Sequence, residues 1–349
     1  MKAWVLSDIG DFSLKEVKDP KPADNEVIVK VKNCGICGSD IPRAFRDGAH
    51  NMPLIIGHEF AGSVIECGKN VSEKWKGKKV GIFPLIPCMK CPSCMNRQYE
   101  MCSKYNYLGS RCNGGFAEYV AVPEWNLIEL SDNISFEQAA MLEPMSVALH
   151  AIRKSGIDMD TKSVAIFGAG TIGLFILMHI LSMGIENVYI IGNHDIQKKK
   201  AAELGLNPDN FIDTRISDPV RLLMDHTCGL GVSATFEVVG TESVYEEAVS
   251  CTGATGRICL VGNPHSDMGL SRNIYWKILR SQLTLCGTWN SSFKGYEDDW
   301  RDVIKSLDKG LIKPETLITH RFTLVDIDRG FHIMRDKSED YIKIMCECT

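Results

Sequence analysis

The stretch VAIFGAGTIGLFILMHILSMGI, residues 164–185, decides the fold. Its 22 residues carry no formal charge, and a segment of this length is long enough to cross a bilayer. However, Gly168, Gly170 and Gly173 crowd its first half, and His179 lies within its second half. These interruptions favour a short buried strand, a glycine turn and a helix over a membrane span.

The glycine turn reads GAGTIG and stands between the expected strand and the expected helix, which is the context of a dinucleotide-binding loop. The first glycine would make the turn, the second would let the backbone approach a pyrophosphate, and the third would pack helix on strand. The free N–H groups at the helix N-terminus would then bind the phosphates. The alternative is a plain glycine turn. The candidate cofactor-binding residues are Gly168, Gly170, Thr171, Ile172 and Gly173.

The pattern of strand-like and helix-like segments changes along the chain and predicts two domains. From about residue 155 to 288, six apolar strands alternate with helical segments, which predicts a doubly wound parallel sheet. Residues 1–154 instead hold short β-type runs between Gly, Pro and Asn, which predict a partly open β-barrel domain. We expect residues 289–349 to return to that first domain, so the fold class is α/β with a barrel and a doubly wound sheet.

Length and charge agree with two globular domains and exclude some functions. The chain has 349 residues, and 39 basic against 44 acidic side chains give a net charge of -5. No basic surplus is present to neutralise a phosphate backbone, which argues against a nucleic-acid partner. The N-terminal segment has no apolar core behind a basic start and does not resemble a signal peptide, so we expect a cytoplasmic protein without a membrane partner.

Four of the fourteen cysteines form a compact pattern, Cys-x-x-Cys-x-x-Cys-x7-Cys. Four thiolates can close a tetrahedron around Zn²⁺ and leave no position for water, so such a site is structural. An iron–sulfur cluster and unligated thiols are the alternatives. The pattern predicts a structural zinc held by Cys88, Cys91, Cys94 and Cys102.

A second set of candidate metal ligands is dispersed. Cys37 lies in GICGSD (35–40), His58 and Glu59 lie in GHEFAG (57–62), and Glu143 follows much later in the chain. A thiolate, an imidazole and a carboxylate are typical of a catalytic zinc with one open position. The spacing alone does not join residues so far apart.

Taken together, these motifs resemble those of the zinc-dependent medium-chain alcohol and polyol dehydrogenases. The likeness also includes GGFAEYV (114–120) and Glu143-Pro144, and it covers essentially the whole chain. It implies a GroES-like barrel domain and a Rossmann domain. It also implies a catalytic zinc on Cys37, His58 and Glu143, with Glu59 as an occasional or neighbouring ligand. Ser39 would relay the proton of the substrate.

The resemblance further implies an NAD- or NADP-dependent oxidation of a secondary alcohol, in a homo-oligomer for which a dimer is favoured. Several segments are most similar to the branch of the family that acts on sugar-alcohol phosphates, and Arg43 and Arg111 in these segments are candidates for binding the substrate phosphate. The alternative for each arginine is an ordinary ion pair. A dehydrogenase of an unphosphorylated polyol or diol, and a zinc-stabilised dinucleotide-binding protein without turnover, are the alternative functions.

Two positions depart from the family pattern. Pro42 occupies the place where other members often carry a histidine that discharges the proton. Gly192 stands where NAD-specific members place a carboxylate for the ribose hydroxyls, which favours tolerance of a 2′-phosphate. His194, Lys198 and Lys199 lie close enough in sequence to favour that phosphate, whereas Asp195 could bind the ribose instead.

Overall fold

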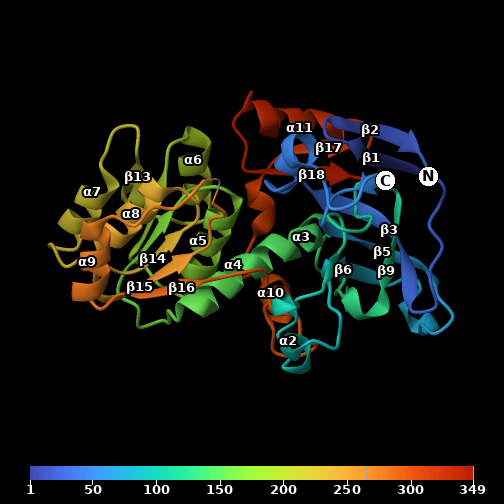
Figure 1. Ribbon diagram of the computed structural model, residues 1–349, viewed down its shortest axis with the longest axis horizontal. Helices are drawn as coiled ribbons and strands as arrows, with labels where there is room; N and C mark the ends of the chain where they lie inside the picture. Colours follow the sequence, from blue (N-terminus) through green and yellow to red (C-terminus); the bar gives the residue numbers. More distant parts are fainter. Residues whose placement is uncertain (265, 349) are drawn as a thin grey trace. The chain divides into compact units, whose positions relative to one another are not determined.

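The computed structural model describes residues 1–264 and 266–348, and the chain forms two compact units (Figure 1). Unit 1 comprises Met1–Glu143 and Ser292–Thr349, and unit 2 comprises Pro144–Ser291. The first boundary falls at the start of one helix, eleven residues before the expected change at residue 154. The expected fold class, a β-barrel domain combined with a doubly wound domain, is confirmed.

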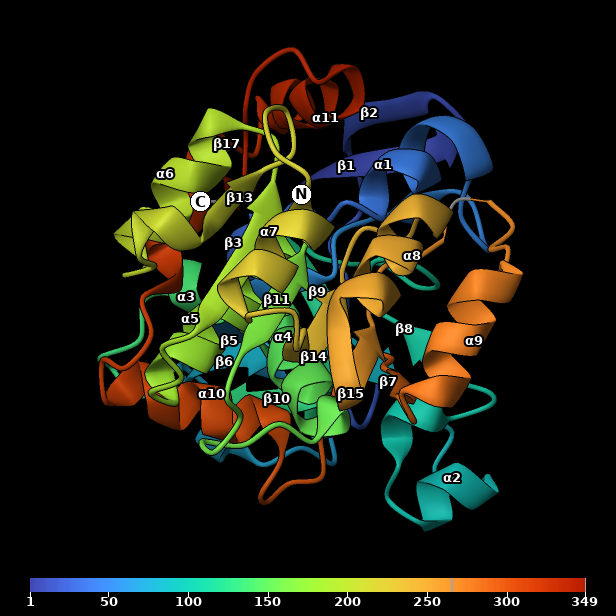
Figure 2. The same ribbon diagram turned by 90° about the vertical axis from the view of Figure 1, so that its left-hand side faces the viewer.

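Unit 2 is built on a six-stranded parallel sheet in the order β13-β12-β11-β14-β15-β16. Its strands are β11 (Val164–Phe167), β12 (Val188–Gly192), β13 (Phe211–Asp213), β14 (Val232–Glu237), β15 (Thr252–Leu260) and β16 (Thr284–Gly287). The helices are α4 (Leu142–Ser155), which starts in unit 1, α5 (Thr171–Ser182), α6 (Asp195–Glu203), α7 (Pro219–His226), α8 (Glu242–Cys251) and α9 (Arg272–Arg280). Figure 2 shows β11, β14 and β15 side by side.

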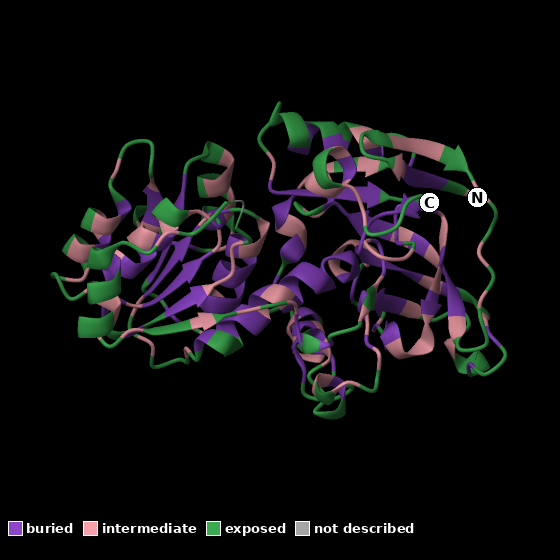
Figure 3. Ribbon diagram, viewed as in Figure 1, coloured by how far each residue is buried: buried purple, intermediate pink, exposed green. Residues whose placement is uncertain are grey.

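The strand order reverses direction at β11, which makes the sheet doubly wound. Right-handed connections then place α5 and α6 on one face and α7, α8 and α9 on the other. The central strands are buried from both sides, as the purple strands of Figure 3 show. Residues 164–185 divide into β11 and α5 as the glycines predicted, and α5 has 12 residues. Among the described residues, no helix is both long and apolar enough to span a bilayer.

Unit 1 is built on a seven-stranded sheet in the order β10-β6-β5-β3-β18-β17, with β9 also paired to β3. The strands are β3 (Glu26–Gly35), β5 (Glu59–Cys67), β6 (Lys79–Ile82), β9 (Tyr119–Pro123), β10 (Leu127–Glu129), β17 (Ile318–Thr323) and β18 (Lys343–Glu347). Strand β18 therefore brings the last described residues of the chain between β3 and β17. Phe60, Phe116 and Phe331 lie at the centre of the apolar core of this unit.

Smaller elements complete unit 1. A three-stranded sheet holds β1 (Lys2–Asp8), β2 (Asp11–Glu16) and β4 (Leu54–Ile55), and a two-stranded sheet holds β7 (Leu85–Ile86) and β8 (Asn106–Tyr107). The helices are α1 (Asp40–Pro42), the π-helical turn η1 (Arg43–Asp47), α2 (Pro92–Met95), α3 (Phe136–Ala140), α10 (Asp299–Asp308) and α11 (Ile327–Asp336). The segment that connects β7 to β8 carries the predicted structural zinc site.

Candidate active site and metal centres

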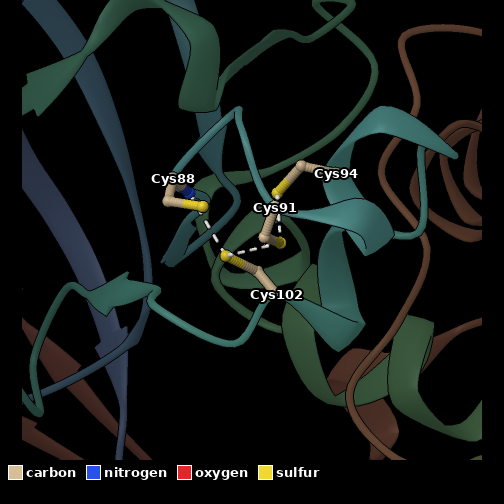
Figure 4. A group of neighbouring side chains, drawn as sticks. All are labelled: Cys88, Cys91, Cys94 and Cys102. Atoms are coloured by element: carbon tan, nitrogen blue, oxygen red, sulfur yellow. Dashed lines mark hydrogen bonds between the residues drawn. The ribbon is translucent and has the colours of Figure 1, made fainter.

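The four cysteines of the compact pattern converge on one point. Their sulfur atoms all lie within 4.8 Å of one another, and Figure 4 shows the side chains turned inward from the loop and from α2. The Sγ atoms of Cys91 and Cys94 are 3.5 Å apart, and those of Cys91 and Cys102 are 3.9 Å apart. We call Cys88, Cys91, Cys94 and Cys102 the four-cysteine cluster.

The chemistry of this cluster fits a metal ion that binds thiolates. Hydrogen bonds from the backbone N–H groups of Cys94 and Ser103 lower the pKa of Cys91 to about 6. Since the thiolate is the form that ligates metals, at least one ligand is already in that form near neutral pH. Four sulfur donors within one short segment suit a closed tetrahedral zinc site.

A second cluster forms where β3 ends and β5 begins. The register pairs Gly35 with Glu59, which brings the two strand ends together, and Cys37 follows two residues after Gly35. One donor atom each from Cys37, His58 and Glu59 lie within 4.8 Å of one another. We call these three residues the mixed cluster. Its sulfur, nitrogen and oxygen donors are those of a catalytic zinc site, and they fit that ion.

Asp40 supports the histidine of the mixed cluster, and the sequence analysis did not single it out. Its carboxylate is fully buried, accepts a hydrogen bond from the Cys37 N–H at 3.1 Å, and lies 3.5 Å from Nδ1 of His58. Burial works to lower the pKa of His58, but Asp40 and Cys37 raise it well above its ordinary value. Partners of this kind orient metal-binding histidines. The signal was available, because Asp40 stands inside GICGSD.

Lys343 supports the carboxylate of the mixed cluster and was also missed. Its ammonium group donates to Oε2 of Glu59 and, at 2.9 Å, to the carbonyl of Ile36. Both side chains of the ion pair are almost fully buried, with 1% and 2% exposed. Burial lowers the pKa of Lys343, but Glu59 and Cys37 more than offset this effect and raise it.

Glu143, the predicted third ligand, lies beside the mixed cluster but is not one of its three grouped residues. Its buried carboxylate accepts a hydrogen bond of 3.1 Å from the Tyr107 hydroxyl, and the Tyr107 ring meets the His58 ring edge-on at 5.8 Å. Burial raises the pKa of Glu143 to about 7. Burial and the neighbouring Glu143 also raise the pKa of Tyr107 well above its ordinary range, so the phenol stays a donor.

Ser39, the predicted proton relay, is exposed and directs its hydroxyl to the thiol of Cys37 at 3.3 Å. Although Ser39 occupies the N-cap position of α1, its side chain makes no cap hydrogen bond there. In the described part of the chain, the Ser39 hydroxyl therefore bonds the Cys37 sulfur and does not cap the helix that it precedes. The Ser39 oxygen lies against the mixed cluster.

The two candidate phosphate-binding arginines occupy neighbouring segments. The Asn51 side chain donates to the carbonyl of Arg111 at 3.1 Å, which ties the segment after η1 to the one after β8. Arg43 donates to the buried carboxylate of Asp40 at 2.6 Å, so it makes the ion pair that was the alternative interpretation. Arg111 stacks its guanidinium on the Tyr105 ring at 4.2 Å and donates to the Tyr105 carbonyl.

The glycine loop of unit 2 has the predicted geometry. Gly168 follows β11 with a φ of +109°, which favours glycine, and Gly170 is the N-cap of α5. A Cβ on Gly173 would lie 1.8 Å from the carbonyl oxygen of Gly168, whereas a Cβ on Gly170 would meet nothing within 4 Å. Gly173 is therefore needed for packing, and the backbone at Gly170 is open to a ligand. Thr171 and Ile172 form the first turn of α5.

At the end of β12, the structure adds a cation to the predicted residues. Gly192 ends the strand and His194 is the N-cap of α6. Arg215, which the sequence analysis missed, binds both Asp195 and Asp213 at 2.5 Å in this neighbourhood, where the Thr214 N–H donates to the Gly192 carbonyl. A Cβ on Gly192 would lie 2.5 Å from Oε1 of Gln197 and 2.9 Å from side-chain atoms of Ala169 and Phe211, so a side chain at this position requires these neighbours to shift.

Comparison with known proteins agrees with both units. The family model described as alcohol dehydrogenase GroES-like domain matches residues 23–132, and the model described as glucose dehydrogenase C-terminus matches residues 136–348. Galactitol 1-phosphate 5-dehydrogenase of Escherichia coli K12 is 35% identical over 301 residues, which is 85% of each chain. (R,R)-butanediol dehydrogenase of Bacillus subtilis is 30% identical over 360 residues and 99% of each chain.

Solved structures extend the likeness over the full length. Galactitol-1-phosphate dehydrogenase from E. coli superposes with a TM-score of 0.92, at 30% identity, over 100% of both chains. A zinc-binding dehydrogenase from Sinorhizobium meliloti 1021, bound to NADP, gives 0.91 at 25% identity over 99% of both chains. The protein belongs to the zinc-dependent medium-chain alcohol and polyol dehydrogenase family.

Proposed function

We propose that the enzyme oxidises a secondary hydroxyl of a sugar-alcohol phosphate, and specifically galactitol 1-phosphate to tagatose 6-phosphate, with NAD or NADP as hydride acceptor. The observation that carries the proposal is the convergence of Cys37, His58 and Glu59, with Glu143 beside them, in a member of this family. An unphosphorylated polyol or diol is the second candidate, because the butanediol enzyme is similar along nearly the whole chain.

The residues of unit 1 have separable tasks in this reaction. When bound, zinc supplies a Lewis acid for the substrate oxygen and the nicotinamide supplies the hydride acceptor. Cys37 and His58 would hold the metal, with Glu143 or Glu59 as the carboxylate ligand. The Asp40 carboxylate, 3.5 Å from Nδ1 of His58, would help to orient the imidazole. The Ser39 hydroxyl lies at the edge of this cluster, where it can accept the proton of the substrate alcohol and pass it to solvent.

Mild chelation should separate the two metal sites. We expect metal to leave the mixed cluster first, together with activity, because a catalytic site keeps an open position. The four-cysteine cluster is closed and should retain its zinc, so the zinc content should fall from two towards one per chain while circular dichroism stays unchanged. Unfolding before the loss of activity would contradict the assignment of the sites, and a single zinc in the untreated protein would contradict the proposed function.

Binding of the substrate phosphate should depend on Arg111 more than on Arg43. A charge-assisted hydrogen bond is worth about 1.5–3 kcal/mol, so Arg111→Ala should lower kcat/KM for galactitol 1-phosphate roughly ten- to a hundredfold and leave galactitol almost unaffected. Arg43→Ala should lower kcat/KM for both substrates alike, because Arg43 neutralises the buried Asp40. The measurement is kcat/KM for both substrates with each variant.

Arg97→Ala is a matched control for this comparison, since Arg97 also lies over a tyrosine ring in unit 1, that of Tyr296. This control variant should leave kcat/KM unchanged for both substrates. Equal losses on phosphorylated and unphosphorylated galactitol after Arg111→Ala would instead favour the polyol or diol candidate.

The cofactor proposal includes NADP because no carboxylate side chain stands at Gly192, while Arg215 lies beside this position. An arginine in this place can accommodate a 2′-phosphate. Asp195 and Asp213 both pair with Arg215, so two carboxylates face this one cation, and this excess of negative charge is compatible with NAD as well.

For the oligomeric state, we propose a homodimer in which an edge strand of the unit 2 sheet contacts the second copy. The sequence suggested two edge strands, GRICLVG (256–262) and LTLCGTW (283–289). The structure corrects the first: β15 pairs on both sides, with β14 and β16. Of these two strands, β16 lies at an edge of the sheet, where Leu285 and, two residues after the strand, Trp289 are exposed.

A further inference from the structure

We infer that Tyr107 is a positioning residue for the catalytic metal site, whose hydroxyl fixes the Glu143 carboxylate beside the mixed cluster. The inference rests on the proposed function, because it concerns the affinity of that site for zinc. It assigns a task to a residue that contributes no metal ligand and that stands in neither of the cysteine motifs.

The contacts of Tyr107 join two parts of the site. Its hydroxyl donates to Oε1 of Glu143, and its ring touches the imidazole of His58 edge-on, with an angle of 66° between the rings. A carboxylate can accept at both oxygens, so the bond at Oε1 leaves Oε2 available to a metal. Glu143 is only 8% exposed, and without the Tyr107 hydroxyl its buried carboxylate would lose a contact that fixes its rotation.

The backbone of Tyr107 is itself held in place. Strand β8 pairs with β7, with Tyr107 opposite Leu85, and the next residue, Leu108, donates its N–H to the carbonyl of Pro84 at 2.9 Å. The Tyr107 carbonyl accepts from the N–H groups of Arg111 and Cys112. The Tyr107 hydroxyl is therefore carried by a backbone that hydrogen bonds hold in place.

The same two strands frame the four-cysteine cluster. Cys88 follows β7 by two residues and Cys102 precedes β8 by four, so the cluster brings together the two ends of the segment that connects the paired strands. A metal bound there would join both ends of this connecting segment and maintain the pairing of Leu85 with Tyr107. A structural zinc in the four-cysteine cluster would in this way support the position of Tyr107 beside Glu143.

The decisive variant is Tyr107→Phe, which removes one oxygen and keeps the ring against His58. Loss of a partner that orients a metal ligand typically costs 10–100-fold in metal affinity. We therefore expect zinc in the mixed cluster to bind about 10–100-fold more weakly, as measured by competition with a chromogenic chelator on the full-length protein. The zinc of the four-cysteine cluster should be retained, and the absorption spectrum of the cobalt-substituted mixed cluster should shift.

Tyr105→Phe is the matched control, because no hydrogen bond from the Tyr105 hydroxyl is found in the described part of the chain. Its zinc affinity should equal that of the wild type. A double-mutant cycle then tests the route of the effect. In a Glu143→Gln background, Tyr107→Phe should change zinc affinity by less than about twofold, because the carboxylate that it orients is absent.

Two outcomes would overturn the inference. One is a zinc affinity of Tyr107→Phe within about twofold of the wild type, which is the scatter of independent sites. The other is the same loss in the Glu143→Gln background, which would mean that Tyr107 acts through the fold. Either result in a wild type that holds two zinc ions overturns the inference alone, whereas a wild type with one zinc overturns the proposed function.

Discussion

Replacing Cys37 with alanine should lower kcat by about a thousandfold or more and leave unit 1 folded. The substitution removes the sulfur donor of the mixed cluster, and with it the site for a Lewis acid. Lewis-acid stabilisation of a developing charge is worth several kcal/mol, and about 4 kcal/mol corresponds to a thousandfold in rate. The measurements are kcat, zinc content and circular dichroism of the same preparation.

The control for Cys37→Ala is Cys91→Ala in the four-cysteine cluster. That change opens a closed structural site, so we expect poor recovery of folded protein and a lower melting temperature in place of a purely catalytic loss. A Cys37→Ala protein that holds two zinc ions and turns over normally would show that the mixed cluster is not the catalytic metal site.

Replacing Lys343 with methionine should strongly destabilise unit 1. Removing one partner of a buried ion pair leaves an uncompensated charge and typically costs about 3–5 kcal/mol. Here the group left behind is Glu59, whose side chain is 2% exposed. The measurement is urea unfolding of the metal-depleted protein, followed by fluorescence to which Trp4, Trp75, Trp125 and Trp300 of unit 1 contribute.

Two comparisons make this result specific to the ion pair. The double variant Lys343→Met, Glu59→Gln should recover much of the lost stability, because it leaves no buried charge without a partner. In zinc-loaded protein the loss should be smaller, since a cation on the mixed cluster would supply the positive charge that Lys343 no longer supplies. Equal losses in both single and double variants would show that Lys343 acts by packing alone.

Most of unit 2 could be predicted because its signals are local. The apolar strands, the glycine turn and the intervening helices alternate along the chain, and the structure shows the same six strands in one sheet. The three glycines follow from steric demands within a few residues, as the contact between Gly173 and Gly168 shows. The four-cysteine cluster is equally local, since a single segment supplies every donor.

The residues that surround the mixed cluster could not be predicted, because their partners are remote in sequence. Lys343 stands among apolar residues in YIKIMC, which marks it as unusual, but Glu59 lies 284 positions away. Tyr107 was not singled out, because its importance depends on a hydrogen bond to a carboxylate 36 residues later. Arg43 was expected at a phosphate, and only the structure shows its carboxylate partner.

The position of β18 has a consequence for how the protein is made. Asn33, Cys34 and Gly35 at the end of β3 pair with the last strand of the chain, and the whole of unit 2 must be translated before that strand leaves the ribosome. At about 5–20 residues per second, the nascent chain waits roughly 15–60 s between the two strands. Throughout this interval the end of β3 is an open edge to which a neighbouring nascent chain can pair. The supply of chaperones during synthesis should therefore affect the yield of this protein more than that of one whose domains are contiguous in sequence.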